Sequence, residues 1–180
     1  VMENLVRAAG ASPASFDELA EALSRVGLIA NTAGLDVEQT SAILAIFAQS
    51  GVRGAEAGTL LRSMLNGLQS TNARQELARL NIALSNVDGT LRPLPDVIDD
   101  LRNSFANMSE VERQASLQRL ADTYGRAGLA ALLAGDSIDT VIASFNAQGD
   151  AASIAAARMS TFSGALTFVR GSLETLQIRA

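Results

Sequence analysis

Apolar residues recur three and four positions apart along most of this chain, which is the spacing of one face of an α-helix. The clearest face consists of Ala57, Leu60, Leu61, Met64, Leu65 and Leu68. Another consists of Phe16, Leu19, Ala20, Leu23, Val26, Gly27 and Ala30. Residues 42–48, AILAIFA, are apolar on nearly all sides, which is typical of a helix buried on most of its surface. Strand patterns are nearly missing, so the spacing predicts an all-α fold.

Capping residues and glycines mark the helix ends in the first half of the chain. Ser15 and Glu18 have the S-x-x-E spacing of a capping box, and Gly34 suits the left-handed residue that often ends a helix. Asp36 is a favourable first cap for the next helix, and Gly51 is expected to close it. The helices predicted here cover residues 1–10, 15–34, 36–49, 57–68 and about 72–84, the last being capped near Asn72 and ending near Leu84.

NVDGTLRPLPD, residues 86–96, is the clearest break between helices. Asp88–Gly89 is a turn dipeptide, while Pro93 and Pro95 are excluded from a helix interior but favourable at a helix start. The inward face of the following helix is predicted to contain Leu94, Val97, Ile98, Leu101 and Phe105. The break offers a possible division of one helical domain, residues 1–180, into parts 1–85 and 93–180.

Ser109 and Glu112 form a second S-x-x-E box, which predicts a helix to about Tyr124. Gly125 and Gly128 are expected to interrupt it, and further helices are expected over residues 127–134, 137–148 and about 150–180. The predicted architecture is a multi-helix bundle of about seven to eight short amphipathic helices with a longer C-terminal helix. Because the chain starts at Val1 inside an expected helix, we interpret it as a fragment of a longer protein.

The last expected helix contains apolar residues spaced 3, 4, 3, 4 and 3 positions apart, as in the seam of a coiled coil. These residues are Met159, Phe162, Leu166, Val169, Leu173 and Leu176. The pattern extends over about two and a half heptads, which is short of the three to four that identify a coiled coil. Two interpretations remain open, an amphipathic helix on the chain's own core and a seam between chains of a homo-oligomer.

Composition removes several classes of function. The chain has no Cys and no His, which excludes disulfides, thiolate chemistry, the usual zinc sites and histidine bases. All 14 basic residues are Arg, the net charge is −5, and the sequence has no basic run. A dedicated or sequence-specific nucleic-acid surface is therefore not expected. The sequence also predicts no metal site and no cofactor, and no apolar run reaches the roughly 18 residues of a membrane span.

The glycine-rich stretch GVRGAEAGTLLR, residues 51–62, resembles a phosphate-binding loop only superficially. The P-loop requires a Lys, which this chain lacks, and a dinucleotide fingerprint would have to follow a strand. We interpret Gly51 as a helix end, Gly54 as the start of the turn and Gly58 as a point of close helix approach.

Acidic residues offer little evidence of catalysis. Asp96, Asp99 and Asp100 lack the spacing of a calcium loop and are explained by the favourable charge of a helix start. The glutamates lie in helical contexts without a recognisable partner group; they are Glu18, Glu38, Glu56, Glu76, Glu110, Glu112 and Glu174. We therefore expect no enzymatic activity from these residues.

Five stretches, in this order, resemble the core region of phage tail tape-measure proteins. They are FDELAEALSRVG, GLDVEQTSAILAIFAQSGVRGAEAGTLLRSMLNGL, NVDGTLRPLPDVIDDLR, TYGRAGLAALL and TFSGALTFVRGSLETL. The matching positions in the glycine-led turn and the stripe after it are Gly51, Ala57, Gly58, Thr59, Leu60 or Leu61, and Arg62. The D-G-x-x-R-P-L turn matches at Asp88, Gly89, Arg92, Pro93 and Leu94. Tyr124 to Ala127 departs mildly from the family's usual Phe-Gly-Arg-Ala.

The resemblance implies a structural protein of a phage, prophage or gene-transfer-agent tail. Its implied role is tail-length determination and tail assembly, with release during genome ejection. The implied partners are other copies of the chain, tail tube, tail-tip or baseplate proteins, and tail assembly chaperones. The implied location is the virion tail, with the host cytoplasm during assembly. The family supplies no catalytic residues, and a membrane-active segment used during DNA delivery is the alternative.

Overall fold

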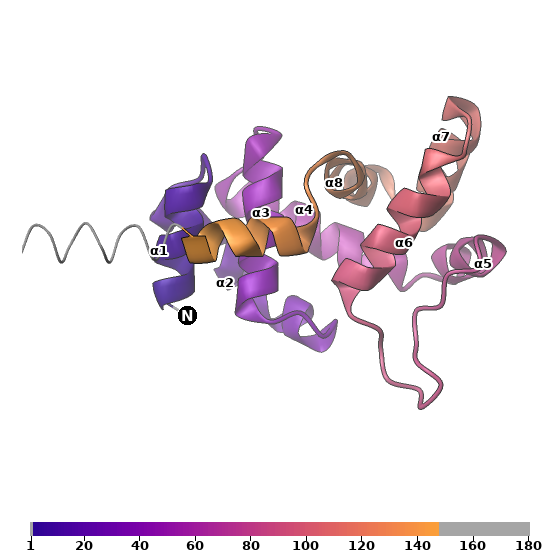
Figure 1. Ribbon diagram of the computed structural model, residues 1–180, viewed down its shortest axis with the longest axis horizontal. Helices are drawn as coiled ribbons and strands as arrows, with labels where there is room; N and C mark the ends of the chain where they lie inside the picture. The colour runs from indigo at the N-terminus through magenta and orange to yellow at the C-terminus, as the bar shows by residue number, and fades with distance from the viewer. Residues whose placement is uncertain (1, 148–180) are drawn as a thin grey trace, which may run out of the picture. The chain divides into compact units, whose positions relative to one another are not determined.

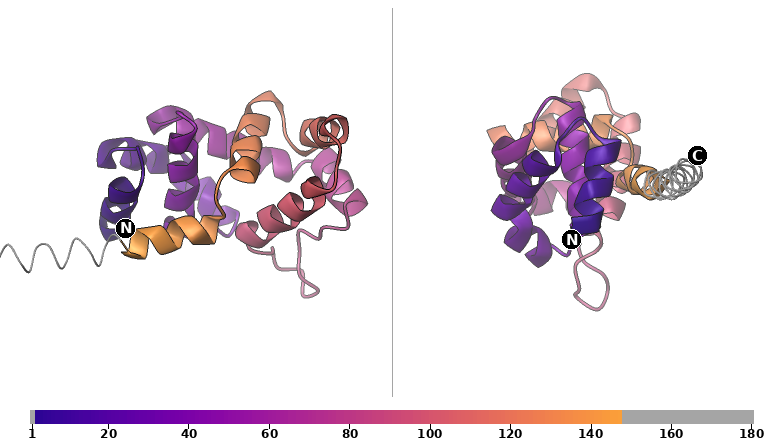
Figure 2. Two further views of the ribbon diagram at one scale, coloured as in Figure 1. Left: turned by 45° about the horizontal axis from the view of Figure 1, so that its top comes forward. Right: turned by 90° about the vertical axis from the view of Figure 1, so that its left-hand side faces the viewer.

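The computed structural model describes residues 2–147, and Val1–Phe145 form one compact unit (Figures 1 and 2). Its helices are α1 (Met2–Ala11), α2 (Phe16–Thr32), α3 (Val37–Gln49), α4 (Gly54–Leu68), α5 (Thr71–Arg79), α6 (Leu94–Ala106), α7 (Glu110–Leu120) and α8 (Thr123–Ala134). A further helix covers Ile138–Ala147. Within residues 2–147, the one β-type pairing outside these helices is the isolated antiparallel bridge between Ser85 and Leu91. The prediction of an all-α multi-helix fold is confirmed.

Local side-chain chemistry begins α2, α3 and α7 where the sequence indicates. Ser15 caps α2, with its backbone N–H donating to Glu18 Oε2 at 2.8 Å while Ser15 Oγ accepts from the Glu18 N–H at 3.3 Å. Equivalent capping boxes begin α3 at Asp36 and α7 at Ser109. Each box satisfies amide groups that have no partner within the helix, which explains why the starts are readable from sequence.

Three helices end in the same left-handed turn. Gly34 after α2 and Gly51 after α3 have φ values of 79° and 87°, as the sequence predicts for a helix end. Asn81 takes this position after α5 with φ of 59°, and the next amide, on Ile82, donates to Leu77 O at 2.8 Å. This pair of features defines a Schellman turn. The predicted extension of α5 to Leu84 is therefore wrong, because asparagine here ends the helix.

Two further boundaries differ from the expectation. The cap of α5 is Ser70, whose Oγ accepts from the Ala73 amide, rather than a residue near Asn72. The helix from Ser109 ends at Leu120 instead of continuing to Tyr124, because Asp122 begins α8 by accepting the Gly125 amide. Gly125 and Gly128 consequently lie inside α8 rather than interrupting a helix.

The core is centred on α3, in which residues 40–48 are all buried. The two polar residues among them are Thr40 and Ser41. The Thr40 hydroxyl donates to Asp36 O at 2.6 Å, and the Ser41 hydroxyl donates to Val37 O at 2.7 Å. The inward residues predicted for α6, from Leu94 to Phe105, are also buried. The predicted helix from about Asp150, with the seam Met159, Phe162, Leu166, Val169, Leu173 and Leu176, lies outside the described residues.

Glycines allow α4 to pack closely on both sides. A Cβ added at Gly58 would lie 2.6 Å from the Ala22 carbonyl oxygen of α2, so backbone meets backbone there. On the other side, a Cβ at Gly125 of α8 would lie 3.0 Å from Met64 Cα. The most extensive contacts of α4 are with α2 and α8, which places it between these two helices.

Candidate functional site

The glycine-led turn before α4 is structural. Gly51 ends α3 as predicted, whereas Gly54, which the sequence predicts as the start of the turn before a helix over 57–68, has φ of 56° and is already the first residue of α4. Ala57 and Gly58 are buried, whereas Thr59 donates its hydroxyl to Ala55 O at 2.9 Å within the helix. Arg62 is exposed on α4. The arrangement serves helix packing, and these side chains do not converge on a common site.

Residues 83–92 form a hairpin loop that extends away from the helices between α5 and α6 (Figures 1 and 2). At its tip the Asn86 amide donates to Thr90 O at 2.8 Å, and the Gly89 amide donates to Asn86 O at 3.0 Å. Asp88 accepts both the amide of Thr90 at 3.0 Å and its hydroxyl at 2.6 Å. These bonds hold the pKa of the Asp88 carboxyl below its usual value. The turn predicted at Asp88–Gly89 is thus a tightly bonded one.

The base of the hairpin loop is fixed to α6. Arg92 donates its amide to Leu84 O at 2.9 Å and its guanidinium to Ala83 O at 3.0 Å. The same guanidinium forms an ion pair with Asp100 at 2.9 Å. Pro93 follows as the cap of α6. The hairpin loop is therefore anchored at its base by Arg92, whose side chain is largely buried.

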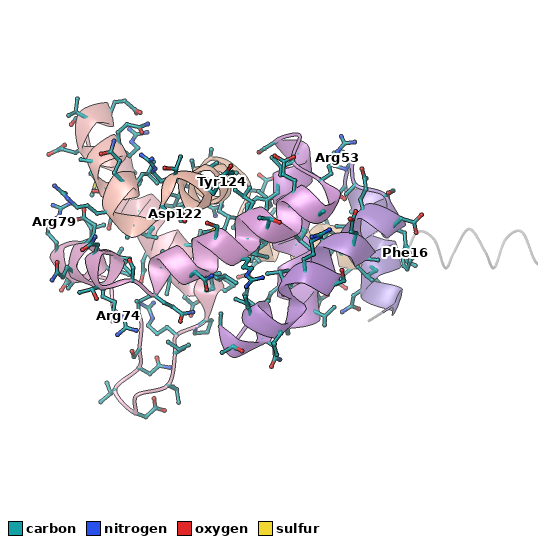
Figure 3. All side chains as sticks on the ribbon, turned by 180° about the vertical axis from the view of Figure 1, so that it is seen from behind. Phe16, Arg53, Arg74, Arg79, Asp122 and Tyr124 are labelled. Carbon is teal, nitrogen blue, oxygen red and sulfur yellow. The ribbon has the colours of Figure 1, made fainter. Side chains whose placement is uncertain are left out.

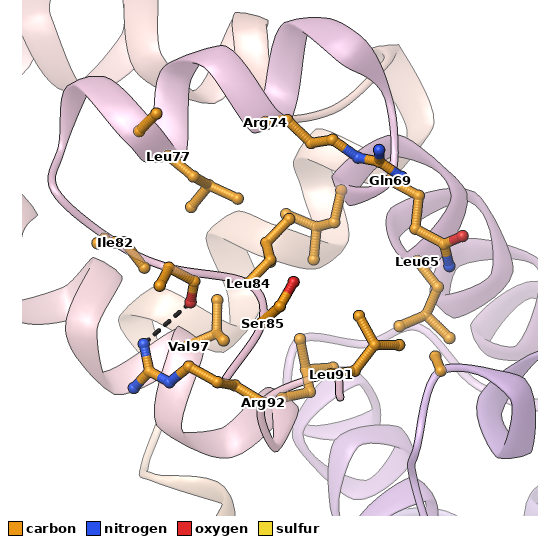
Figure 4. Close-up of a pocket in the computed structure, with 15 residues that line it drawn as sticks. Leu65, Gln69, Arg74, Leu77, Ile82, Leu84, Ser85, Leu91, Arg92 and Val97 are labelled. Carbon is orange, nitrogen blue, oxygen red and sulfur yellow. Dashed lines mark hydrogen bonds between the residues drawn. The ribbon is translucent and has the colours of Figure 1, made fainter. Parts of the chain in front are cut away.

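An open apolar pocket of about 420 Å³ lies beside the hairpin loop (Figure 4). Its lining comes from Ala33 at the end of α2, from α4, α5 and α6, and from the hairpin loop with the residues before it; it includes Leu65, Leu77, Ile82, Leu84, Leu91 and Val97. Arg74 and Gln69 lie at its edge, and the Arg74 side chain extends toward Gln69 in Figure 4. Within residues 2–147 the Arg74 guanidinium forms no ion pair or hydrogen bond with a side chain. The volume lies in the range of small-molecule pockets.

A buried carboxylate joins α5 to α7. Glu76, only 3% exposed, accepts a two-point interaction from Arg79, with Nη2 at 2.6 Å and Nε at 3.0 Å. Ser116 Oγ donates to it at 2.7 Å, and Arg119 adds a weaker contact at 3.4 Å. Hydrogen bonding from Arg79 is the main cause that lowers the pKa of Glu76 to about 2.

This cluster corrects the expectation that the glutamates lack partners. The partners of Glu76 are two arginines and a hydroxyl, which keep the carboxylate charged and leave it unable to exchange protons near neutral pH. Both arginines are about half exposed, and Arg79 lies at the outer edge of α5 (Figure 3). The arrangement is that of a charged carboxylate held between two arginines, and Glu112 of α7 also lies near enough to Arg79 to interact with it electrostatically.

The acidic cluster at the start of α6 is divided among different partners. Asp96 lies in the first turn, where the helix dipole favours it. Asp99 pairs with Arg102 at 3.0 Å, and Asp100 pairs with Arg92. Arg102 also donates to the carbonyls of Leu132, Gly135 and Asp136 and so caps the end of α8. Across residues 2–147, no group of three or more acidic side chains is arranged to bind a metal.

Sequence reasoning identified the turn at Asp88–Gly89 but missed the pocket beside it. The pocket residues that were not identified are Arg74 and several apolar residues. The sequence indicates that these apolar residues are buried but not that they line a pocket. Asn81 is the one local signal in the sequence, because asparagine can end a helix in the left-handed conformation. An α5 that ends there leaves residues 82–85 outside the helix, where they line the pocket.

Within the described part of the chain, no single helix has both the length and the apolar composition of a membrane span. The pair Thr123–Ala134 and Ile138–Ala147 meets these two criteria together, although the helices are bent by 65° at the break.

Comparison with known proteins gives consistent matches to phage tails. The family model described as "Phage-related minor tail protein" matches residues 1–122. The "Tape measure protein" of Pneumococcus phage Dp-1 is 29% identical over 183 residues, which cover 99% of this chain and 16% of that protein. The "Probable tape measure protein" of Escherichia phage P2 is 29% identical over 94 residues, which cover 51% of this chain and 12% of that protein. No solved structure matches significantly.

Proposed function

Because this chain belongs to the family of phage-related minor tail proteins, we propose that it is part of a tape-measure protein that acts in tail assembly and tail-length determination and is released during genome ejection. The support is the agreement between the family match and two relatives named for this role. The chain spans less than a fifth of the length of either relative. The parent protein would belong to the virion tail and pass through the host cytoplasm during assembly.

Within that protein, residues 2–145 act as a folded assembly module rather than as a stretch of ruler. The observation that carries this is the division into short helices around the buried α3, the longest helix within residues 2–147 being α2 with 17 residues. As one straight helix, residues 2–145 would extend about 220 Å, whereas α2 alone extends about 25 Å. A folded unit of this size has a radius of gyration of about 15 Å.

The test is tail length measured by electron microscopy after deleting residues 2–145 in frame from the parent gene. A folded module predicts either failure of tail assembly or tails whose length changes by no more than about 40 Å, the diameter of such a unit. Uniform tails shortened by roughly 220 Å would contradict the module and show that the segment is read in extended form.

A matched deletion tests the parent protein separately. Removal of 144 residues from a continuous helical region elsewhere in the parent is expected to shorten tails by about 1.5 Å per residue. Unchanged tail length after that deletion would contradict the tape-measure role itself, whatever the result for residues 2–145.

A second candidate function is membrane activity during DNA delivery, favoured by the bent apolar pair Thr123–Ala134 and Ile138–Ala147. In the folded unit the inward residues of this pair, including Leu129, Leu132 and Phe145, are buried in the core. Insertion would therefore require the pair to leave the core. Leakage of dye-loaded liposomes at micromolar protein would support this candidate, and its absence would remove it for this segment.

We further propose that the segment has no enzymatic activity, no cofactor and no sequence-specific nucleic-acid partner. Its partners would be tail tube, tail-tip or baseplate proteins and assembly chaperones. The arginine-paired state of Glu76 supports the proposal on catalysis, because this buried carboxylate is held charged. Clearing of a cell-wall suspension by the purified chain would contradict it.

A further inference from the structure

Val87 is the most exposed of the large apolar side chains in residues 2–147, with a relative exposure of 110%. It belongs to the turn that the bonds between Asn86 and Thr90 close at the tip of the hairpin loop. The loop itself extends away from the helices (Figures 1 and 2). Leu91, at the base of the same loop, is 53% exposed. A single exposed apolar side chain is ordinary, but this one stands on a projecting loop next to an open apolar pocket.

The hairpin loop is held in shape before any contact is made. Its tip is closed by the bonds between Asn86 and Thr90 and between Asp88 and Thr90, and its base by the bridge between Ser85 and Leu91. A loop that is already ordered loses little conformational freedom on binding. The tip is therefore suited to insertion into a partner surface.

The pocket provides a complementary surface. Its walls are formed by leucine, isoleucine and valine side chains, while Arg74 at its edge lacks a side-chain partner within residues 2–147. Asp88 follows Val87 directly, and its carboxylate stays charged because its pKa is lowered. An apolar side chain next to an acidic one on the tip thus matches an apolar pocket next to an arginine.

The hairpin loop of one molecule cannot fill its own pocket in this arrangement. Ser85 and Leu91, which the bridge joins, line the pocket, whereas residues 86–90 between them do not. The tip and the pocket are nevertheless neighbours on one surface, so two copies related by a two-fold axis can exchange tips reciprocally.

We propose that this surface is an interface between two copies of the chain, in which each hairpin tip inserts into the pocket of the other copy. Val87 contacts the apolar wall, and Asp88 lies beside Arg74 of the second copy. The exchange is isologous and closes at two copies. It concerns Ala33 and residues 65–97, and it does not depend on the C-terminal seam or on the tail function.

The first test is sedimentation equilibrium of the complete 180-residue chain. V87S is expected to weaken self-association at least tenfold, whereas V111S, at a valine that is 80% exposed on α7, leaves it unchanged. R74E is expected to weaken self-association as well. R62E, the matched charge reversal at an exposed arginine of α4, is expected to leave it unchanged. A monomeric wild-type chain at all accessible concentrations, or equal association of V87S and V111S, would overturn the proposal.

The second test uses the absence of cysteine from the chain. Chains carrying V87C are mixed with chains carrying A78C, a position that lines the pocket, under mild oxidation. The proposal predicts a mixed disulfide between the two chains that forms much faster than with V111C in place of V87C. Equal rates would show that the copies meet elsewhere, for example through the C-terminal seam, and would overturn the proposal.

Discussion

Replacing Gly58 by alanine tests whether α4 and α2 meet backbone to backbone. The new Cβ would lie 2.6 Å from the Ala22 carbonyl oxygen and 3.1 Å from Ala22 Cα, so one of the two helices has to move. Overpacking of this kind costs about 1–3 kcal/mol. The gain in helix propensity from glycine to alanine offsets about 0.5–1 kcal/mol. We expect a net destabilisation of about 1–2 kcal/mol.

Gly27 in α2 provides the matched control, because an added Cβ would meet nothing within 4 Å. The same substitution there keeps only the gain in helix propensity and should stabilise by about 0.5–1 kcal/mol. The two alanine variants should therefore differ by about 1.5–3 kcal/mol. Urea unfolding followed by circular dichroism measures this as midpoints shifted in opposite directions. Equal stabilisation by both substitutions would refute the close contact between α4 and α2.

Three further perturbations test the contacts that hold the unit together. Glu76→Gln should destabilise by roughly 1–2 kcal/mol at pH 7, a value reduced by the exposure of Arg79. Folding lowers the pKa of Glu76 from 4.5 to about 2. The difference in free energy of unfolding between wild type and Glu76→Gln is therefore complete above pH 4.5 and disappears as the pH falls toward 2. A difference that stays constant in urea titrations across this range would contradict the ion pair. Asn81→Gly should stabilise by up to about 1 kcal/mol, because glycine has no left-handed penalty, and a lower melting temperature would contradict the assigned turn. Arg102→Met should cost about 1.5–3 kcal/mol by leaving the last carbonyls of α8 without their charged donor, and amide exchange in α8 should accelerate selectively.

The starts of α2, α3 and α7 were predictable from the sequence because the atoms that make them are three residues apart. Ser15 and Glu18, and Ser109 and Glu112, satisfy each other's amides without any help from the rest of the fold. The ends at Gly34 and Gly51 were predictable for the same local reason. The end of α5 differs from the prediction because Asn81 takes the left-handed conformation that glycine usually takes, and the end of α7 differs because Asp122 caps the next helix.

The candidate interaction surface depended on tertiary structure. The pocket brings together residues as far apart as Ala33 and Val97, and periodicity identifies such residues as apolar without showing which remain uncovered. The partners of Glu76 include Ser116, 40 positions away, so the sequence alone could not separate this glutamate from the others.

The sequence by itself determined the all-α class, most helix boundaries, the turn at Asp88–Gly89 and the resemblance to tape-measure proteins, because each follows from groups close together along the chain. Only the tertiary structure decided that α4 meets α2 at Gly58, that Glu76 is held between α5 and α7, and that an apolar pocket lies beside Val87. The reason is that close approach, burial and pocket shape depend on which helices become neighbours, and spacing along one helix does not encode the identity of the helix across from it.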